Sequence, residues 1–304
     1  MQADEPMVAA LRDVLEPRVD KLRKRLKKAK KGDPEGVHDS RTELRRLRAD
    51  LDLMGHTVFD AETTAEVCRR MRQLEQALAK TRDTDVLIED LDGYLRRRAR
   101  ERAGLGELRK LLTKRRHKGE RTARRALRRR ARREVVQSLE GLLRRKAVVS
   151  ERRSGNPAKA SPTLVRHFTR QEIWRRYDAL RAYDARLPGD IETLHKLRSS
   201  CRQMRFALEA FADALPTVKP IAGELHRVQD EIGELHDHHV ALGLVDRWRR
   251  KGRLATTPAL EHYLAYHART RDRVRKRFER HWLSLFGEQF RRRVFRSLEK
   301  EAAR

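Results

Sequence analysis

Apolar residues recur at helical spacing along most of the chain. The segment from Asp4 to Lys31 shows this pattern, because its apolar side chains return every three or four residues and fall on one stripe. Leu, Ala, Arg, Glu and Lys dominate, whereas the alternation of Val, Ile and Thr that is typical of strands is absent. The sequence therefore predicts an all-α fold.

Gly and Pro divide the helical pattern into separate elements. Gly32 and Pro34 end one helix and open the next, because Gly readily stops a helix and Pro suits the first turn of another. Residues 150–161 lack apolar periodicity and are rich in Ser, Gly and Pro, so they predict a connector. We expect a first half over residues 6–149, a second half over residues 162–290 and a basic C-terminal helix over residues 291–304.

The two halves contain the same motif. A shift of 157 residues aligns residues 32–54 with residues 189–211 without a gap. The aligned pairs include Gly32/Gly189, Asp33/Asp190, His38/His195, Arg41/Arg198, Arg45/Arg202 and Arg48/Arg205. Such a repeat constrains the architecture more than any single motif does. Two separately folded copies would satisfy it, but each half has only about four helices with which to close a core. We therefore favour one pseudo-symmetric unit.

Each copy of the motif places one histidine and three arginines on one helix face. At about 100° per residue, their spacing keeps them within about an 80° arc and extends them about 15 Å along the axis. The first row consists of His38, Arg41, Arg45 and Arg48, and the second row consists of His195, Arg198, Arg202 and Arg205. The first helix repeats the spacing with Lys21, Lys24 and Lys28, and the same shift of 157 residues pairs Lys24 with Arg181.

The charge of the chain indicates that these rows meet an anion. There are 74 Lys and Arg against 45 Asp and Glu, a formal net charge of +29, which favours a polyanionic partner. Like charges on one helix face repel by about 0.2–0.5 kcal/mol per pair, and few acids lie within the rows to offset this. Arginine suits phosphate because its planar guanidinium donates two parallel hydrogen bonds and keeps its charge. Nearby arginines should lower the pKa of a histidine, so acid should mildly favour anion binding.

Other classes of protein fit the sequence less well. No apolar run approaches the roughly 18 residues of a membrane span, and the N-terminal segment lacks the basic start of a signal peptide, so we expect a cytoplasmic protein. Cys68 and Cys201 provide neither a disulfide framework nor a four-ligand zinc site. The cluster at residues 236–239 lacks the spacing of a helical zinc pair, so we expect no metal and no cofactor. We interpret Asp83 and Asp85 as orienting arginines at a helix start, not as a general acid and base.

Two segments resemble the signature helices of the CHAD family, an all-helical domain named for its histidines: VHDSRTELRRLRADLDLM and LHKLRSSCRQMRFALEAF. Residues 80–91, KTRDTDVLIEDL, resemble the family's Arg-Asp-x-Asp-Val-Leu element. Residues 232–245 resemble its looser counterpart, although residues 236–239 replace the usual Asn-Asp. The resemblance covers about residues 6–290 and implies one CHAD domain. It implies two four-helix bundles related by a pseudo-twofold axis, with basic helices lining a central groove or pore.

The resemblance also implies non-catalytic binding of inorganic polyphosphate and an association with polyphosphate granules. The sequence contains no catalytic motif and no nucleotide-binding glycine loop. It also lacks the Glu-x-Glu-x-Lys motif of the triphosphate-tunnel enzymes that are often fused to this domain, so we expect no enzyme activity. The expected polyphosphate site comprises His38, Arg41, Arg45, Arg48, His195, Arg198, Arg202, Arg205, Lys21, Lys24, Lys28 and Arg181.

Two alternatives to this function remain open, and so does the extent of the site. The charge would equally suit sequence-independent binding of nucleic acid, although an aromatic content of 5% leaves few platforms for stacking bases. A polyphosphate-processing enzyme is the other alternative. Two further basic faces, at residues 121–133 and 269–280, either join the site or extend outward.

Overall fold

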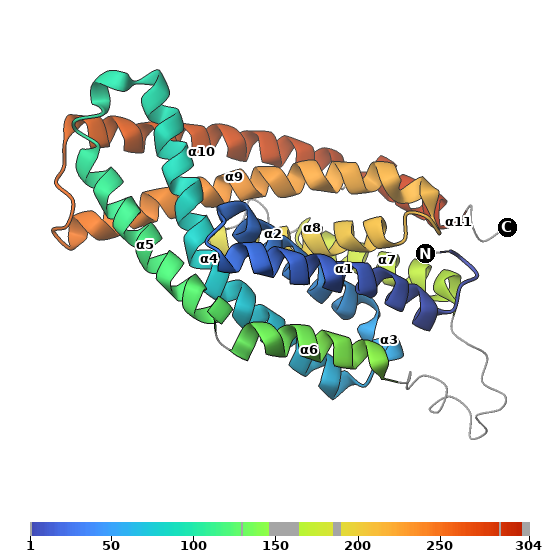
Figure 1. Cartoon of the computed structure of the whole chain (residues 1–304). Coiled ribbons are helices and arrows are strands. Elements are labelled where there is room, and N and C mark those ends of the chain that lie inside the picture. The colour runs from blue at the N-terminus through green and yellow to red at the C-terminus, as the bar shows by residue number, and fades with distance from the viewer. Residues whose placement is uncertain (1, 129, 146–163, 185–189, 286, 300–304) are drawn as a thin grey trace.

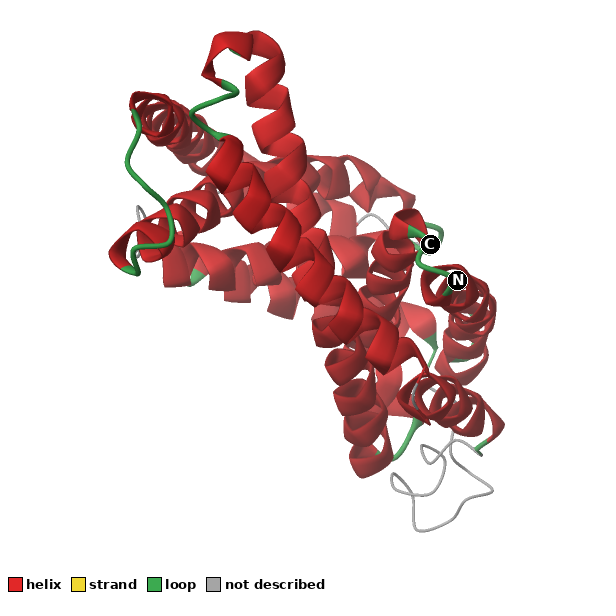
Figure 2. Ribbon diagram, turned by 60° about the vertical axis from the view of Figure 1, so that its left-hand side comes forward, coloured by secondary structure: helices red, strands yellow, loops and turns green. Residues whose placement is uncertain are grey.

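The described part of the chain is helical. The computed structural model describes residues 2–128, 130–145, 164–184, 190–285 and 287–299, and Figure 2 shows these residues as helices joined by short loops. No β-strand occurs within these ranges apart from one isolated bridge between Pro6 and Leu164. The all-α prediction is therefore confirmed. No helix in the described ranges is both long and apolar enough to cross a lipid bilayer.

The helices of the second half follow the order of those in the first half (Figure 1). The first half contains α1 (Met7–Lys30), α2 (Pro34–Asp50), a π turn (Leu51–Gly55), α3 (His56–Val58), α4 (Ala61–Arg97), a 3₁₀ turn (Ala99–Glu101), α5 (Gly106–Arg128) and α6 (Arg130–Arg144). The second half contains α7 (Val165–Arg181), α8 (Ile191–Ala210), a 3₁₀ turn (Pro216–Val218), α9 (Lys219–Arg250), α10 (Pro258–Leu285) and α11 (Glu288–Glu299).

Local sequence explains where the two repeated helices begin. The Asp33 carboxylate accepts from the backbone N–H groups of Glu35 and Gly36 at the start of α2, and Asp190 accepts from Thr193 at the start of α8. These caps satisfy N–H groups that have no partner within their own helix. A Cβ on Gly36 would lie 2.7 Å from the backbone nitrogen of Ala29, so glycine lets α1 and α2 approach closely.

Both hydrophobic clusters draw residues from both halves of the chain. The larger cluster contains residues of α1, α2 and α6 together with residues of α7, α8 and α11. The smaller cluster joins the C-terminal part of α4 and the start of α5 to the C-terminal part of α9 and the start of α10. The two halves therefore share their cores. The division into two four-helix bundles stays a prediction.

The basic helical pattern from Glu107 to Lys146 predicts one long helix. In the structure, α5 and α6 run at an angle to each other (Figure 1). The start of α5 packs in the smaller cluster, and its C-terminal part packs with α6 in the larger one, so the two helices follow both cores. The predicted connector at residues 150–161 lies outside the described residues. The C-terminal helix α11 starts at Glu288, ahead of the expected 291, and residues 300–304 are not described.

Candidate anion-binding site

The two signature helices α2 and α8 contact each other between α4 and α9. α2 packs against α4 in the first half, and α8 packs against α9 in the second half. Leu44 and Leu47 of α2, with Leu197 and Met204 of α8, are buried in the larger cluster, so the arginine rows lie on the remaining faces of these helices. This arrangement brings the two rows together with side chains of α4 and α9.

The first arginine row meets carboxylates from α4. Arg41 lies 3.4 Å from Asp83, and its side chain is only 11% exposed. Arg45 lies 3.2 Å from Glu75, and Arg48 forms an ion pair with the same carboxylate. Each of these arginines therefore has a counter-charge within the protein. Figure 1 shows α4, the helix that supplies both acids, running past α2.

The second arginine row is compensated much less. The Arg202 guanidinium donates to the Ser199 hydroxyl at 3.3 Å, and no carboxylate of the described residues forms an ion pair with Arg202 or Arg198. The Arg198 guanidinium lies over Gly233 of α9, where an added Cβ would be 3.0 Å from one of its nitrogens. Arg205 is buried and differs from the other two, because it donates to Glu209 at 2.5 Å and to Gln229 at 3.2 Å.

Electrostatics shows that the rows converge. Burial, followed by the nearby charges of Arg45 and Arg198, lowers the pKa of Arg202 to about 10. Burial and the charge of Arg41 also lower the pKa of Arg45, and Arg198 adds to this effect. We call Arg41, Arg45, Arg48, Arg198 and Arg202 the central arginine cluster. Because these guanidiniums stay protonated at neutral pH while repelling one another, a bound anion would stabilise them.

The histidines that head the rows are both exposed but have different neighbours. Partial burial lowers the pKa of His38, and Arg82 adds to this effect. The His38 side chain lines a pocket of about 490 Å³ together with Arg82 and Arg116. The ring centroid of His195 lies 5.6 Å from that of His236 on α9. The two histidines therefore hold corresponding positions in the motif but face different groups.

Four of the expected site residues lie away from this cluster. Lys21, Lys24 and Lys28 are exposed on α1, and Arg181 is exposed at the end of α7. No described contact joins any of them to the central arginine cluster. Their spacing matched that of the rows, but α1 packs with its apolar stripe inward and directs these cations to solvent.

The two further basic faces also stay outside the cluster. Arg121 and Arg125 are exposed on α5, and Arg273, Lys276 and Arg280 are exposed on α10. No described contact links them to the central arginine cluster, and the side chains of residues 128–131 lie outside the described residues.

The acids of α4 take the expected role in a different place. Asp83 accepts from Arg41, and Asp85 accepts from Arg116 at 2.6 Å, so both orient arginines. They lie in the middle of α4, however, not at a helix start, because α4 continues unbroken from Ala61 to Arg97. Sequence reasoning missed Glu75 and Gln229, since helical periodicity does not reveal which residues of α4 and α9 face the rows.

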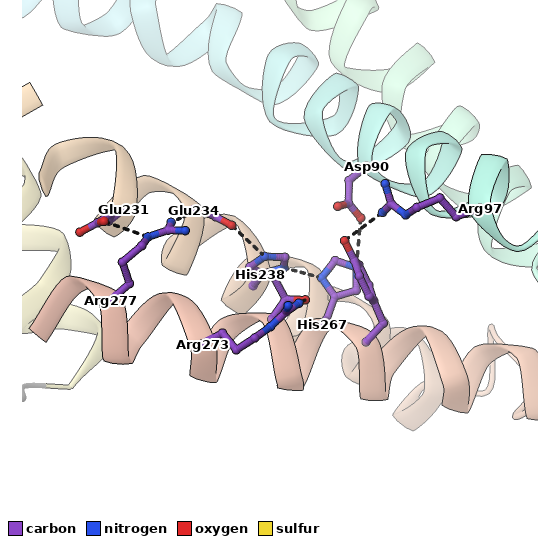
Figure 3. Close-up of polar contacts among 10 residues, drawn as sticks. Asp90, Arg97, Glu231, Glu234, His238, His267, Arg273 and Arg277 are labelled. Carbon is purple, nitrogen blue, oxygen red and sulfur yellow. Dashed lines mark hydrogen bonds and ion pairs between the residues drawn. The ribbon is translucent and has the colours of Figure 1, made fainter. Parts of the chain in front are cut away.

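The histidine cluster of α9 divides between two environments. His236 lies beside His195, whereas the ring of His238 is buried, with its Nδ1 2.7 Å from Nδ1 of His267 on α10. His267 in turn lies 3.1 Å from Asp90 of α4 (Figure 3). Within the described residues, no group of three His, Cys, Asp or Glu side chains is arranged to hold a metal ion.

Comparison with known proteins gives a family and a fold. The sequence pattern of the CHAD domain matches residues 13–246. PptA from Streptomyces chartreusis has a similar structure, with a TM-score of 0.72 and 19% sequence identity over 91% of this chain and 99% of that chain. The crystal structure of the CHAD domain from the plant Ricinus communis gives a TM-score of 0.65 and 20% identity over 98% of this chain and 93% of that chain. No curated protein sequence matches this chain.

Proposed function

This chain belongs to the CHAD family, and from that premise we propose that it binds inorganic polyphosphate without catalysing its turnover, in the cytoplasm and at polyphosphate granules. Convergence of Arg45, Arg198 and Arg202 is the observation that carries the proposal. In addition to burial, the charge of Arg198 on α8 lowers the pKa of Arg45 on α2, and the charges of both lower the pKa of Arg202. A chain of phosphates would offset this repulsion.

The charge balance of the site supports a polyanion. Glu75 and Asp83 form ion pairs with the cluster, and Asp237 shares a pocket with Arg198, whose charge partly offsets the burial that raises the pKa of Asp237. Five guanidiniums therefore face three carboxylates. A flexible phosphate chain can follow such a cluster and accept paired hydrogen bonds from several arginines. Affinity for polyphosphate should then fall steeply as salt rises, because each phosphate contact releases counterions.

A titration tests the placement of the site. We expect Arg41→Ala combined with Arg198→Ala to weaken binding of long-chain polyphosphate far more than Arg291→Ala combined with Arg296→Ala. Arg291 and Arg296 are exposed on α11, and their replacement removes the same charge. Equal losses in the two variants, at one salt concentration, would show that net charge alone governs binding.

Two further measurements separate polyphosphate binding from the alternatives. Long-chain polyphosphate should displace DNA from the protein at equal phosphate concentration, and DNA should fail to displace polyphosphate. Incubation with polyphosphate and magnesium should leave its chain length unchanged. Displacement in the opposite direction would favour a nucleic-acid-binding protein, and shortened or lengthened chains would favour an enzyme.

A further inference from the structure

A second cationic pocket lies at the end of the molecule opposite the N-terminus, where the turn between α4 and α5 meets the start of α10 (Figure 1). Its volume is about 570 Å³, within the range of small-molecule sites. We call it the tip pocket. It is lined by Tyr94, Arg97, Arg98, Arg100, Glu101, Gly104, Pro258, Ala259, His262, Tyr266 and Arg269.

Arginines outnumber acids in the lining of the tip pocket. Arg97, Arg98, Arg100 and Arg269 form no ion pair with a carboxylate among the described residues. Glu101 is the one acid in the lining, and internal partners occupy it. It is buried, accepts from the Tyr94 hydroxyl, and lies 3.4 Å from Nδ1 of His262.

The walls of the tip pocket are already in place. The ring of Tyr94 packs against those of Tyr263 and Tyr266, with centroids 5.0 and 5.2 Å apart. A Cβ on Gly104 would lie 2.7 Å from that of Ala259, so this glycine permits the two tips to touch. The Thr257 hydroxyl donates to the Gly104 carbonyl at 3.0 Å. These contacts fix the walls of the tip pocket, whereas its four arginines are exposed and reach the ligand from solvent.

Acidic side chains separate the tip pocket from the central arginine cluster. A pocket of about 430 Å³ lies between them, lined by Arg198 on one side and Tyr266 on the other. Its lining contains the carboxylates of Asp90, Asp230, Glu234 and Asp237. Figure 3 shows Asp90 and Glu234 beside the two buried histidines, and Arg97 at the far end, where it donates to the Tyr266 hydroxyl at 3.1 Å. A phosphate chain would be repelled on this path, so the two cationic sites are independent.

We propose that the tip pocket binds a small molecule carrying a diphosphate or triphosphate group. Four guanidiniums and one carboxylate leave three positive charges, which match such a group at neutral pH. Tyr94, Pro258 and Ala259 add an apolar wall, so the remaining space can hold an organic group attached to the phosphates. This site goes beyond the proposed polyphosphate function and does not depend on it.

Calorimetric titration of the full chain with ATP, at about 0.15 M ionic strength, tests the proposal. We expect Arg98→Gln combined with Arg269→Gln to weaken ATP binding by about tenfold or more, since charge-assisted hydrogen bonds to phosphate are lost. Arg291→Gln with Arg296→Gln removes the same charge from α11 and should change it less than about twofold. An unchanged affinity in the tip variant would overturn the proposal, as would an equal loss in the two variants.

Inorganic triphosphate in place of ATP identifies the source of the phosphate group. If ATP binds more tightly than inorganic triphosphate, the apolar wall contacts the organic group of the ligand. If both bind equally, the site recognises the phosphates alone. Should the tip variant fold poorly, Arg98→Lys with Arg269→Lys keeps the charge and removes the paired hydrogen bonds. We expect that variant to bind ATP at an intermediate affinity, and a wild-type affinity would count against arginine recognition. Long-chain polyphosphate titrated into the tip variants reports separately on the central cluster.

Discussion

The two arginine rows have the same spacing but different counter-charges. In the first half, Glu75 of α4 pairs with Arg45 and Arg48. Matching residues 82–87 of α4 to residues 236–241 of α9 places Gln229 at the position of Glu75. Gln229 accepts from Arg205, as Glu75 accepts from Arg48, but it brings no charge. Arg198 and Arg202 of the second row therefore form no ion pair with a carboxylate among the described residues, whereas Arg205 pairs with Glu209.

The largest expected effect tests this difference directly. Arg198→Gln with Arg202→Gln removes two uncompensated charges and should weaken polyphosphate binding by roughly 30-fold or more, or about 2 kcal/mol. Arg48→Gln with Glu75→Gln removes an ion pair and leaves net charge unchanged, so affinity should change less than about threefold. Titration of both variants at one salt concentration gives the comparison. Similar losses would mean that the two halves contribute alike.

A smaller effect should follow when the second half is made like the first. Gln229→Glu places a carboxylate beside Arg205 of the second row, so polyphosphate affinity should fall by about three- to tenfold. Gln171→Glu, at an exposed position of α7, makes the same charge change elsewhere and serves as the control. If both variants bind alike, the position of the charge is unimportant.

Making the first half like the second should lower stability and raise affinity for polyphosphate. Glu75→Gln leaves Arg45 and Arg48 half-buried without their carboxylate, so the free energy of unfolding should fall by about 1–2 kcal/mol. Polyphosphate affinity should rise by about three- to fivefold because two more guanidiniums become available. Thermal unfolding with and without polyphosphate measures both, since a ligand of the folded state raises Tm. A variant that loses stability and gains no affinity would show that Glu75 does not compete with the ligand.

The smallest effect concerns pH. Burial and nearby arginines lower the pKa of His38 in the free protein, whereas a bound anion would raise this pKa again. The complex then holds more protons than the free protein, so affinity should rise as pH falls from about 7.5 to about 5.5, by about two- to threefold. His38→Gln should flatten this dependence, and His117→Gln, at an exposed site on α5, should leave it intact. A pH profile that is the same in both variants would exclude His38 as its source.

Local sequence rules predicted the helices and their charged faces well. The all-helical fold and the spacing of both rows follow from residue types and periodicity within one helix. The caps Asp33 and Asp190, seen in the structure, obey the same local rules. Long-range packing decided the rest. Lys24 shares the spacing of the rows yet faces solvent on α1. Glu75 faces Arg45 and Arg48 because of the register of α4 on α2. The tip pocket joins segments that no local pattern connects.

The Pro6–Leu164 bridge brings the starts of α1 and α7, the first helix of each half, side by side. If the halves were identical chains in a homodimer, any substitution would appear on both sides at once, so a carboxylate could not be kept opposite one row and lost opposite the other. A single chain is free of that constraint. One half can then specialise in ion pairs that hold the helices together while the other keeps arginines without such pairs.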